Sequence, residues 1–126
     1  MRYLLDSQVL LWALADPRRL PASTRRLLEA SDAEFCFSLG SIWEIAIKRS
    51  LGKLDFDPDL IANAAEADGY AALPILREHL SVVAQLPWHH RDPFGRLLVA
   101  QSLAEPMTLL TADAALARYG PTVRVI

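Results

Sequence analysis

The sequence predicts an α/β fold in which a mainly parallel sheet of five strands lies between layers of helices. Short apolar runs alternate with helical patterns along the chain, as in proteins built from strand–helix–strand units. Most of these runs do not alternate between polar and apolar residues, which indicates strands covered on both faces. The chain has 126 residues, 52% of them hydrophobic and 22% charged, so we expect one domain over residues 1–126.

Five apolar runs are the predicted strands. In chain order they are RYLL at 2–5, EFCFS at 34–38, YAALPI at 70–75, MTLLT at 107–111 and VRVI at 123–126. Between them lie segments with helical patterns, which cover residues 7–15, 24–31, 41–51, 57–67, 75–86, 93–105 and 113–119. Three of these have a capping residue before them, namely Ser23, Asp57 and Asp92. Glycine or proline follows the end of five of the seven segments, at Gly52, Gly69, Pro87, Pro106 and Gly120.

Composition excludes several classes of protein. The formal net charge is −2, so contact with nucleic acid would depend on local basic clusters rather than on bulk charge. The clusters are Arg18 with Arg19, Arg25 with Arg26, Lys48 and Arg49 with Lys53, and His89 to Arg91 with Arg96. The single cysteine, Cys36, rules out a disulfide framework and a cysteine zinc site. The apolar N-terminus lacks a cleavage site and no stretch is long enough for a bilayer, so we expect a cytoplasmic protein without a membrane partner.

Two aspartates follow predicted strands. Asp6 comes directly after the run at 2–5, and Asp113 comes two residues after Thr111. Active sites of such folds form at the carboxyl ends of the strands, so both carboxylates would share one edge if their strands are neighbours. Each aspartate also has a simpler interpretation as the cap of the helix that follows it.

Glu44 is harder to explain structurally, because it lies among apolar residues in SIWEIAIK. A buried carboxylate needs a partner, which is either Lys48 at i+4 or a cation shared with Asp6 and Asp113. Asp92, at the start of the helix at 93–105, is a fourth acid. Carboxylates gathered in one pocket repel one another unless a cation neutralises them, and Mg²⁺ or Mn²⁺ prefers such oxygen ligands. A site of this kind suits phosphate chemistry.

At this point the chain resembles a known family. LLDSQVLLWAL, SLGSIWEIAIKRSLGKL, HHRDPFGRLLVAQSL and LLTADAALARYG are similar to successive motifs of PIN-domain ribonucleases, specifically the VapC-type toxins of toxin–antitoxin pairs. The resemblance covers nearly the whole chain. It implies an α/β/α sandwich around a parallel sheet and a Mg²⁺- or Mn²⁺-dependent endoribonuclease. It also implies a homodimer and a hetero-oligomer with a cognate antitoxin.

The family's site residues carry over by position onto Asp6, Glu44, Asp92 and Asp113, as metal ligands and catalytic residues. One departure is important. The motif usually reads H-x-D-P-F-D-R, and its second aspartate, normally a core metal ligand, is Gly95 here. Asp92 and position 95 share a helix face, so Asp92 could partly substitute through a bridging water, but catalytic geometry tolerates little misplacement. Two origins fit the glycine: natural loss in a member that still binds its antitoxin, or a single base change that inactivates a toxic protein.

Other residues are candidates for contact with the RNA substrate. They are Ser7, which stands where the family often has threonine, and the basic residues Lys48, Arg91 and Arg96. Gln8 stands where histidine is common. His89 and His90 are expected to lie on the surface of a loop. Trp12, Trp43 and Trp88 are expected in the core or at its rim, although Trp88 could also stack on a base.

Three other functions are alternatives to an active ribonuclease. A catalytically silent toxin fold could still bind the antitoxin and take part in repression of their operon. A phospho-accepting receiver domain would need an aspartate after the third strand and a lysine after the fifth, and the runs at 70–75 and 123–126 have neither. A phosphatase with two aspartates after its first strand does not fit either, because Ser7 and Gln8 follow Asp6.

Overall fold

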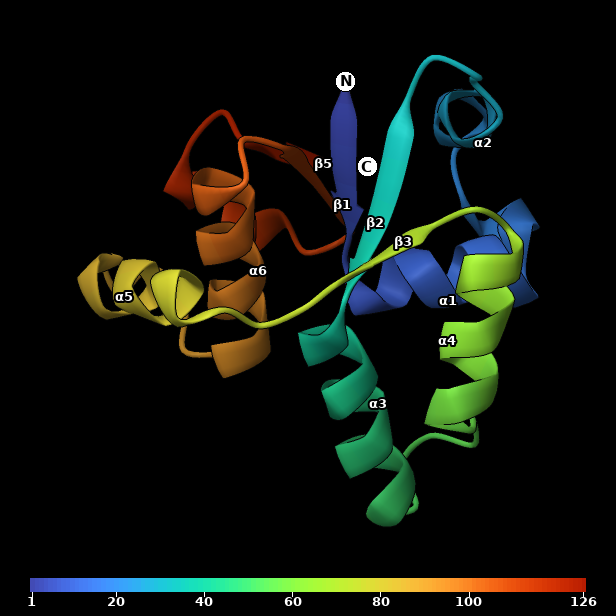
Figure 1. Cartoon of the computed structure of the whole chain (residues 1–126), viewed down its shortest axis with the longest axis horizontal. Helices are drawn as coiled ribbons and strands as arrows, with labels where there is room; N and C mark the ends of the chain where they lie inside the picture. Colours follow the sequence, from blue (N-terminus) through green and yellow to red (C-terminus); the bar gives the residue numbers. More distant parts are fainter.

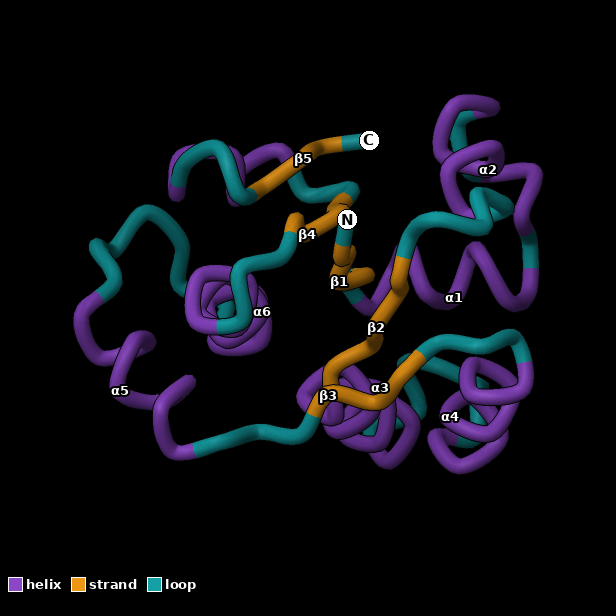
Figure 2. The backbone as a smooth tube through the Cα atoms, turned by 45° about the horizontal axis from the view of Figure 1, so that its top comes forward, coloured by secondary structure: helices purple, strands orange, loops and turns teal.

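Five parallel strands form the central sheet of the computed structural model, which describes all of residues 1–126. The strands are β1 (Arg2–Leu5), β2 (Glu34–Ser38), β3 (Ala71–Leu73), β4 (Thr108–Thr111) and β5 (Val123–Val125). Their order across the sheet is β3-β2-β1-β4-β5, so β1 lies at the centre (Figure 2). The predicted parallel sheet of five strands is therefore confirmed.

Helices cover both faces of this sheet. On one face lie α1 (Ser7–Ala15), α2 (Ala22–Leu28) and α4 (Pro58–Ala67), and on the other lie α5 (Arg77–Gln85) and α6 (Pro93–Ala104) (Figures 1 and 2). The helix α3 (Leu39–Ser50) continues from the carboxyl end of β2 and packs against both α4 and α6. Two short 3-10 helices complete the chain, η1 (Pro17–Arg19) and η2 (Ala114–Tyr119). The three-layer α/β/α arrangement is thus as expected.

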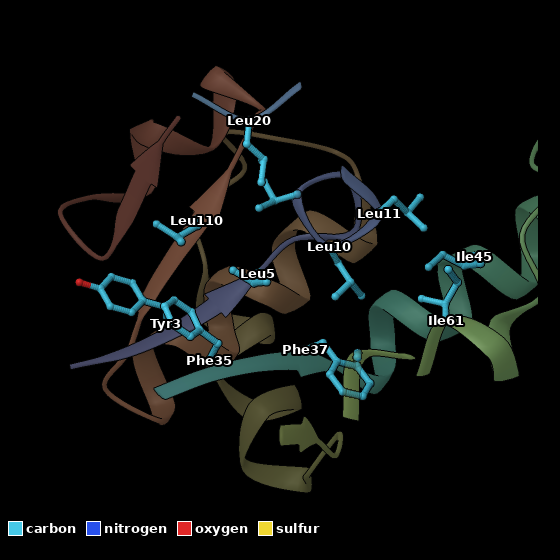
Figure 3. Packing of buried hydrophobic residues seen from close by; sticks show 12 residues of the cluster. Tyr3, Leu5, Leu10, Leu11, Leu20, Phe35, Phe37, Ile45, Ile61 and Leu110 are labelled. Atoms are coloured by element: carbon cyan, nitrogen blue, oxygen red, sulfur yellow. The ribbon is translucent and has the colours of Figure 1, made fainter. Parts of the chain in front are cut away.

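Alternation along the strands divides the core into two clusters. Tyr3, Leu5 and Phe37 lie in the cluster under α1 and α4, which Figure 3 shows from close by. Leu4 of β1 and Leu109 of β4, which are paired across the two strands, lie in the cluster under α6 on the other face of the sheet. Because both faces of the sheet are covered, both sets of side chains are apolar, and this explains why the strands show no polar alternation.

The helix α6 is buried on nearly all sides. Its residues from Gly95 to Ser102 are all buried, because the sheet, α5, α3 and η2 surround it. One close approach is decisive for α3: a Cβ at Gly40 would lie 2.5 Å from the Leu97 Cδ2 of α6. A larger residue would force the end of the buried Leu97 side chain to move, so Gly40 lets α3 pack tightly against α6.

Four predicted helix starts or types differ from the structure. The helix expected after Ser23 begins at Ala22 with Pro21 as its cap, because the fixed φ of proline suits a helix start. Ser38 caps α3, with its hydroxyl accepting from the Gly40 N–H at 2.9 Å, so this helix begins two residues before the expected position. The fifth helix begins at Arg77, after Pro74. The segment after Asp113 is a 3-10 helix, a type common in short connections.

None of the helices combines the length and the apolar character that crossing a membrane requires.

Candidate metal centre

Asp6 is both a helix cap and a buried carboxylate at the centre of the sheet. Its Oδ1 accepts the Val9 N–H at 2.8 Å, which caps α1, while its Oδ2 accepts from the Thr111 hydroxyl and, at 3.3 Å, from the Ala112 N–H. The residue is only 8% exposed. Burial raises the pKa of this carboxyl and the nearby Glu44 raises it further, while the three hydrogen bonds partly oppose them.

Asp113 lies two residues beyond the end of β4, the strand next to β1 in the sheet. Its Oδ1 accepts the Ala115 N–H at 3.0 Å and so caps η2. The hydroxyl of Thr111 accepts the Asp113 N–H at 3.0 Å while it donates to Asp6. One threonine therefore connects the two aspartates. It was not among the predicted site residues, although its place at the end of a central strand is a signal for such a role.

Glu44 reaches the same place from α3. One carboxylate oxygen accepts from the Ser7 hydroxyl at 2.5 Å, and the other is 2.8 Å from the Lys48 Nζ. The side chain of Glu44 is 13% exposed. Of the two partners that the sequence left open, the structure has the ion pair with Lys48, and it also places Glu44 in the same cleft as Asp6 and Asp113, where a shared cation would bind.

Asp92 caps α6 with both oxygens, which accept the N–H groups of Phe94 at 3.1 Å and Gly95 at 3.2 Å. Gly95 is buried, and a Cβ there would lie 3.2 Å from the Asp92 Oδ2 and 3.3 Å from the Leu116 Cδ2. An aspartate at position 95 would therefore lie beside Asp92, and the flexible end of Leu116 would have to move by a few tenths of an ångström.

These residues line a single cleft of about 140 Å³. It contains the four acids together with Ser7, Gln8, Lys48 and Gly95, and apolar side chains from α1, α3, α6 and η2. Lys48 is the only cation among the lining residues, so four carboxyl groups face one ammonium group. Carboxylate and hydroxyl oxygens are the ligand types that Mg²⁺ or Mn²⁺ prefers, and the four acids share this cleft, but no three of them place ligand atoms within 4.8 Å of one another.

His90 has a position that the sequence did not predict. Its Nδ1 accepts the Asp92 N–H at 2.9 Å, so its Nε2–H donates to the Asp113 Oδ2 at 2.9 Å. The expectation of a loop-surface role is therefore wrong for His90, which joins two of the acids. His89 packs edge-on against Tyr119, with 5.0 Å between the ring centroids.

Of the four candidate RNA contacts, three are accessible at the cleft or on the surface and one is buried. Ser7 and Lys48 line the cleft, and Arg91 is exposed. Arg96 departs from the expectation, because it is only 4% exposed and its guanidinium donates to backbone carbonyls such as Pro87 O at 2.9 Å. Its role is to anchor the segment before α6. A buried arginine of this kind has no sequence signal that separates it from a surface one.

The one group of three potential metal ligands whose atoms lie close together is found between α5 and α6, away from the cleft. Glu78, His79 and Glu105 offer atoms within 4.8 Å of one another. However, His79 is fully buried with both ring nitrogens in use: Nδ1 accepts the Leu76 N–H at 3.0 Å and Nε2 lies 2.8 Å from Glu105. We assign this group to the packing of the two helices.

Comparison with known proteins agrees with this geometry. A family model described as PIN domain matches residues 3–120. Among solved structures, the chain is similar to one described as VapBC2 from Rickettsia felis bound to a DNA fragment from their promoter, with a TM-score of 0.72 and 15% identity over 100% of this chain and 98% of that chain. At this identity the likeness shows the fold. A search of curated proteins gave no match.

Proposed function

The chain belongs to the PIN-domain family, and on this premise we propose that it is a metal-dependent endoribonuclease, the toxin of a toxin–antitoxin pair. The observation that carries the proposal is the meeting of Asp6, Glu44, Asp92 and Asp113 in one cleft with a single cation beside them. Such a cleft favours a divalent cation and, through it, the phosphate groups of RNA.

In this proposal Asp6, Glu44 and Asp113 would hold Mg²⁺ or Mn²⁺, and Asp92 would contribute from the start of α6. A divalent cation held there would supply a Lewis acid for water activation and for the charge that develops on the phosphate, and attack by water would leave a 5′-phosphate product. Ser7 orients Glu44 through its 2.5 Å hydrogen bond. Thr111 and His90 orient Asp6 and Asp113 in the same way. These hydrogen bonds hold the carboxylates in place before the cation binds.

Positive charge for the RNA backbone is available beside the acids. The Lys48 ammonium, half exposed, lies at the cleft and can turn from Glu44 to a phosphate once a metal ion neutralises Glu44. Arg91 is exposed one residue before Asp92. Point charges of this kind bind the backbone and carry no sequence information, so we propose that recognition depends mainly on RNA shape.

The partners are carried over from the resemblance and from the solved VapBC2 structure. We propose a cognate antitoxin that covers this chain, a homodimer, and a hetero-oligomer of the two proteins. The VapBC2 structure contains a promoter DNA fragment, which makes operon repression by the complex the corresponding proposal here.

Cleavage of structured RNA with Mg²⁺ or Mn²⁺ tests the activity. We expect slow cleavage by the native chain, none by Asp6→Asn, and cleavage roughly tenfold or more faster by Gly95→Asp, since catalytic geometry tolerates little misplacement. The proposal is wrong if neither the native chain nor Gly95→Asp cleaves RNA and Asp6→Asn binds Mn²⁺ as the native chain does.

A second candidate is a catalytically silent toxin fold that binds the antitoxin. The buried Gly95, with Leu116 packed 3.3 Å from its missing Cβ, favours it. Calorimetric titration with Mn²⁺ separates the two: no binding by the native chain and restored binding by Gly95→Asp would identify the silent module.

A further inference from the structure

The segment between α5 and α6 is held by a buried arginine. The guanidinium of Arg96 donates to Val83 O at 3.1 Å, to Pro87 O at 2.9 Å and to the Tyr119 hydroxyl at 3.1 Å. Tyr119 in turn donates to Pro87 O at 2.9 Å and accepts the His90 N–H at 3.2 Å. Because these groups are satisfied inside the protein, the loop from Leu86 to Asp92 has a defined path.

This loop presents an aromatic ring to solvent. Trp88 is 77% exposed, the largest exposed fraction of any large hydrophobic side chain, yet its ring centroid lies 3.8 Å from the guanidinium carbon of Arg96. A cation at this distance over an indole face is a favourable contact, and Arg96 is itself fixed. One face of the indole is therefore covered and the other is open, on a side chain that loses little conformational freedom when it binds.

Trp88 lies on the loop that leads to the acidic cleft. Trp88 is two residues before His90, whose ring donates to Asp113, so the two Cα atoms are at most about 7 Å apart. The exposed Arg91 follows on the same loop. Without a bound cation the cleft repels a phosphate backbone, since its acids outnumber its single basic side chain, so a contact outside the cleft would strengthen substrate binding.

We infer that the open face of Trp88 is a stacking platform for one nucleobase of single-stranded RNA, next to the phosphate at the cleft. The inference rests on the proposed function. Stacking uses the π-face that every base has, so the platform favours an unpaired base over a particular sequence. The guanidinium of Arg96 beneath the indole and the exposed Arg91 three residues further along the loop suit an anionic strand better than an apolar protein surface.

The experiment is a binding cycle that does not depend on cleavage. Fluorescence anisotropy with a labelled single-stranded RNA of about ten nucleotides is measured with Mn²⁺ and with EDTA. In a series of such RNAs, each base in turn is replaced by an abasic site. The proteins are the native chain, Trp88→Leu, the aromatic variant Trp88→Phe, and Leu80→Ala as a matched truncation of an exposed apolar residue on α5.

We expect Trp88→Leu to weaken binding about 5- to 100-fold, Trp88→Phe to retain most of the affinity, and Leu80→Ala to have no effect. One abasic position should weaken binding to the native chain by a similar factor and have no further effect on Trp88→Leu. A purely structural role for Trp88 would instead weaken binding to all the RNAs alike, with no such coupling.

Equal binding by the native chain and Trp88→Leu overturns the inference, and if the native chain also cleaves RNA, the proposed function stands without it. Absence of RNA binding by the native chain with Mn²⁺ overturns both. If Trp88→Leu changes only the association of two copies of the chain in sedimentation, Trp88 is a protein contact and the platform is wrong.

Discussion

At the scale of single residues, each carboxylate of the cleft is held by the protein before any cation binds. Asp6, Asp92 and Asp113 accept backbone N–H groups as helix caps, and Glu44 accepts from Ser7 and Lys48. A cap and a ligand are therefore not alternatives at these positions. The cap determines where the carboxylate lies, and the remaining lone pairs of its oxygens are available to a cation.

The raised pKa of Asp6 predicts a pH-dependent stability. Burial raises this pKa above 3.8, so the folded chain binds a proton more tightly than the unfolded chain does. Ionised Asp6 therefore destabilises the metal-free fold as pH rises from 3.8 through the raised pKa. Asp6→Asn removes this effect.

Consequently, the stability of Asp6→Asn relative to the native chain should increase as pH rises from about 4 to about 7.5 in EDTA. Urea unfolding at several pH values measures this difference. Any constant cost of the amide's hydrogen bonds cancels, because only the change with pH is compared. A difference that is independent of pH would contradict the prediction.

His90 is predicted to be a positioning residue for the metal site. His90→Ala removes the donor that holds the Asp113 Oδ2. Loss of such an outer hydrogen bond typically weakens metal affinity about 10- to 100-fold. Calorimetric titration with Mn²⁺ measures the change, and His89→Ala is the matched control, since His89 packs on Tyr119 and touches none of the acids. An equal loss in both variants would show that the loop, and not the hydrogen bond, is responsible.

At the scale of elements, the cleft depends on how closely α3 and α6 approach each other. α3 carries Glu44 and α6 begins at the Asp92 cap, and the two helices meet where Gly40 faces Leu97. Gly40, which does not line the cleft, thus influences the site by allowing the two helices to pack closely.

Gly40→Ala is predicted to disturb both the fold and the site. Its Cβ would lie 2.5 Å from the Leu97 Cδ2, and overpacking of this kind typically costs about 1–3 kcal/mol. Urea unfolding should show that loss, together with weaker binding of Mn²⁺. Leu97→Ala removes the atoms that clash, so the double variant should lose less stability than the sum of the two single variants. Additive losses would mean that the two helices are not in contact there.

The elements themselves were largely predictable from local pattern. The bounds of β1, β2 and α1 and the cap at Asp57 agree with the structure, because apolar runs and capping residues act over a few neighbouring positions. The four acids were also predicted as one group and now line one cleft. Thr111, His90 and the buried Arg96 were not predicted, because their partners are distant in the sequence and depend on the path of a loop.

At the scale of the whole molecule, strand order determines where the cleft forms. The chain winds from β1 to β2 and β3 in one direction and returns to place β4 on the other side of β1. Asp6 and Asp113 follow two adjacent strands at this reversal, the usual position of a ligand site in a parallel sheet. The chain carries a net charge of only −2, yet four carboxyl groups meet at this one point.

This concentration of acids predicts that a divalent cation stabilises the whole fold. A ligand that binds only the folded chain stabilises it by about 2.7 kcal/mol at a free concentration a hundredfold above its Kd. Mn²⁺ should therefore raise the unfolding midpoint of the native chain. It should raise that of Gly95→Asp more at the same concentration, because a further carboxylate joins the site. Glu34→Gln removes an exposed acid at the amino end of β2, whereas the cleft lies at the carboxyl ends of the strands, so this variant should respond to Mn²⁺ as the native chain does.

In EDTA we expect Gly95→Asp to have a lower unfolding midpoint than the native chain, which reverses their order at high Mn²⁺ concentration. Gly95→Asp then adds a carboxylate beside Asp92 and moves Leu116, so its metal-free form should be less stable than the native chain. Thermal unfolding of both proteins across a series of Mn²⁺ concentrations should give two curves that cross. Curves that stay parallel would mean that position 95 does not contribute to the metal site, because the added carboxylate would then carry its repulsion at every metal concentration without any gain in binding.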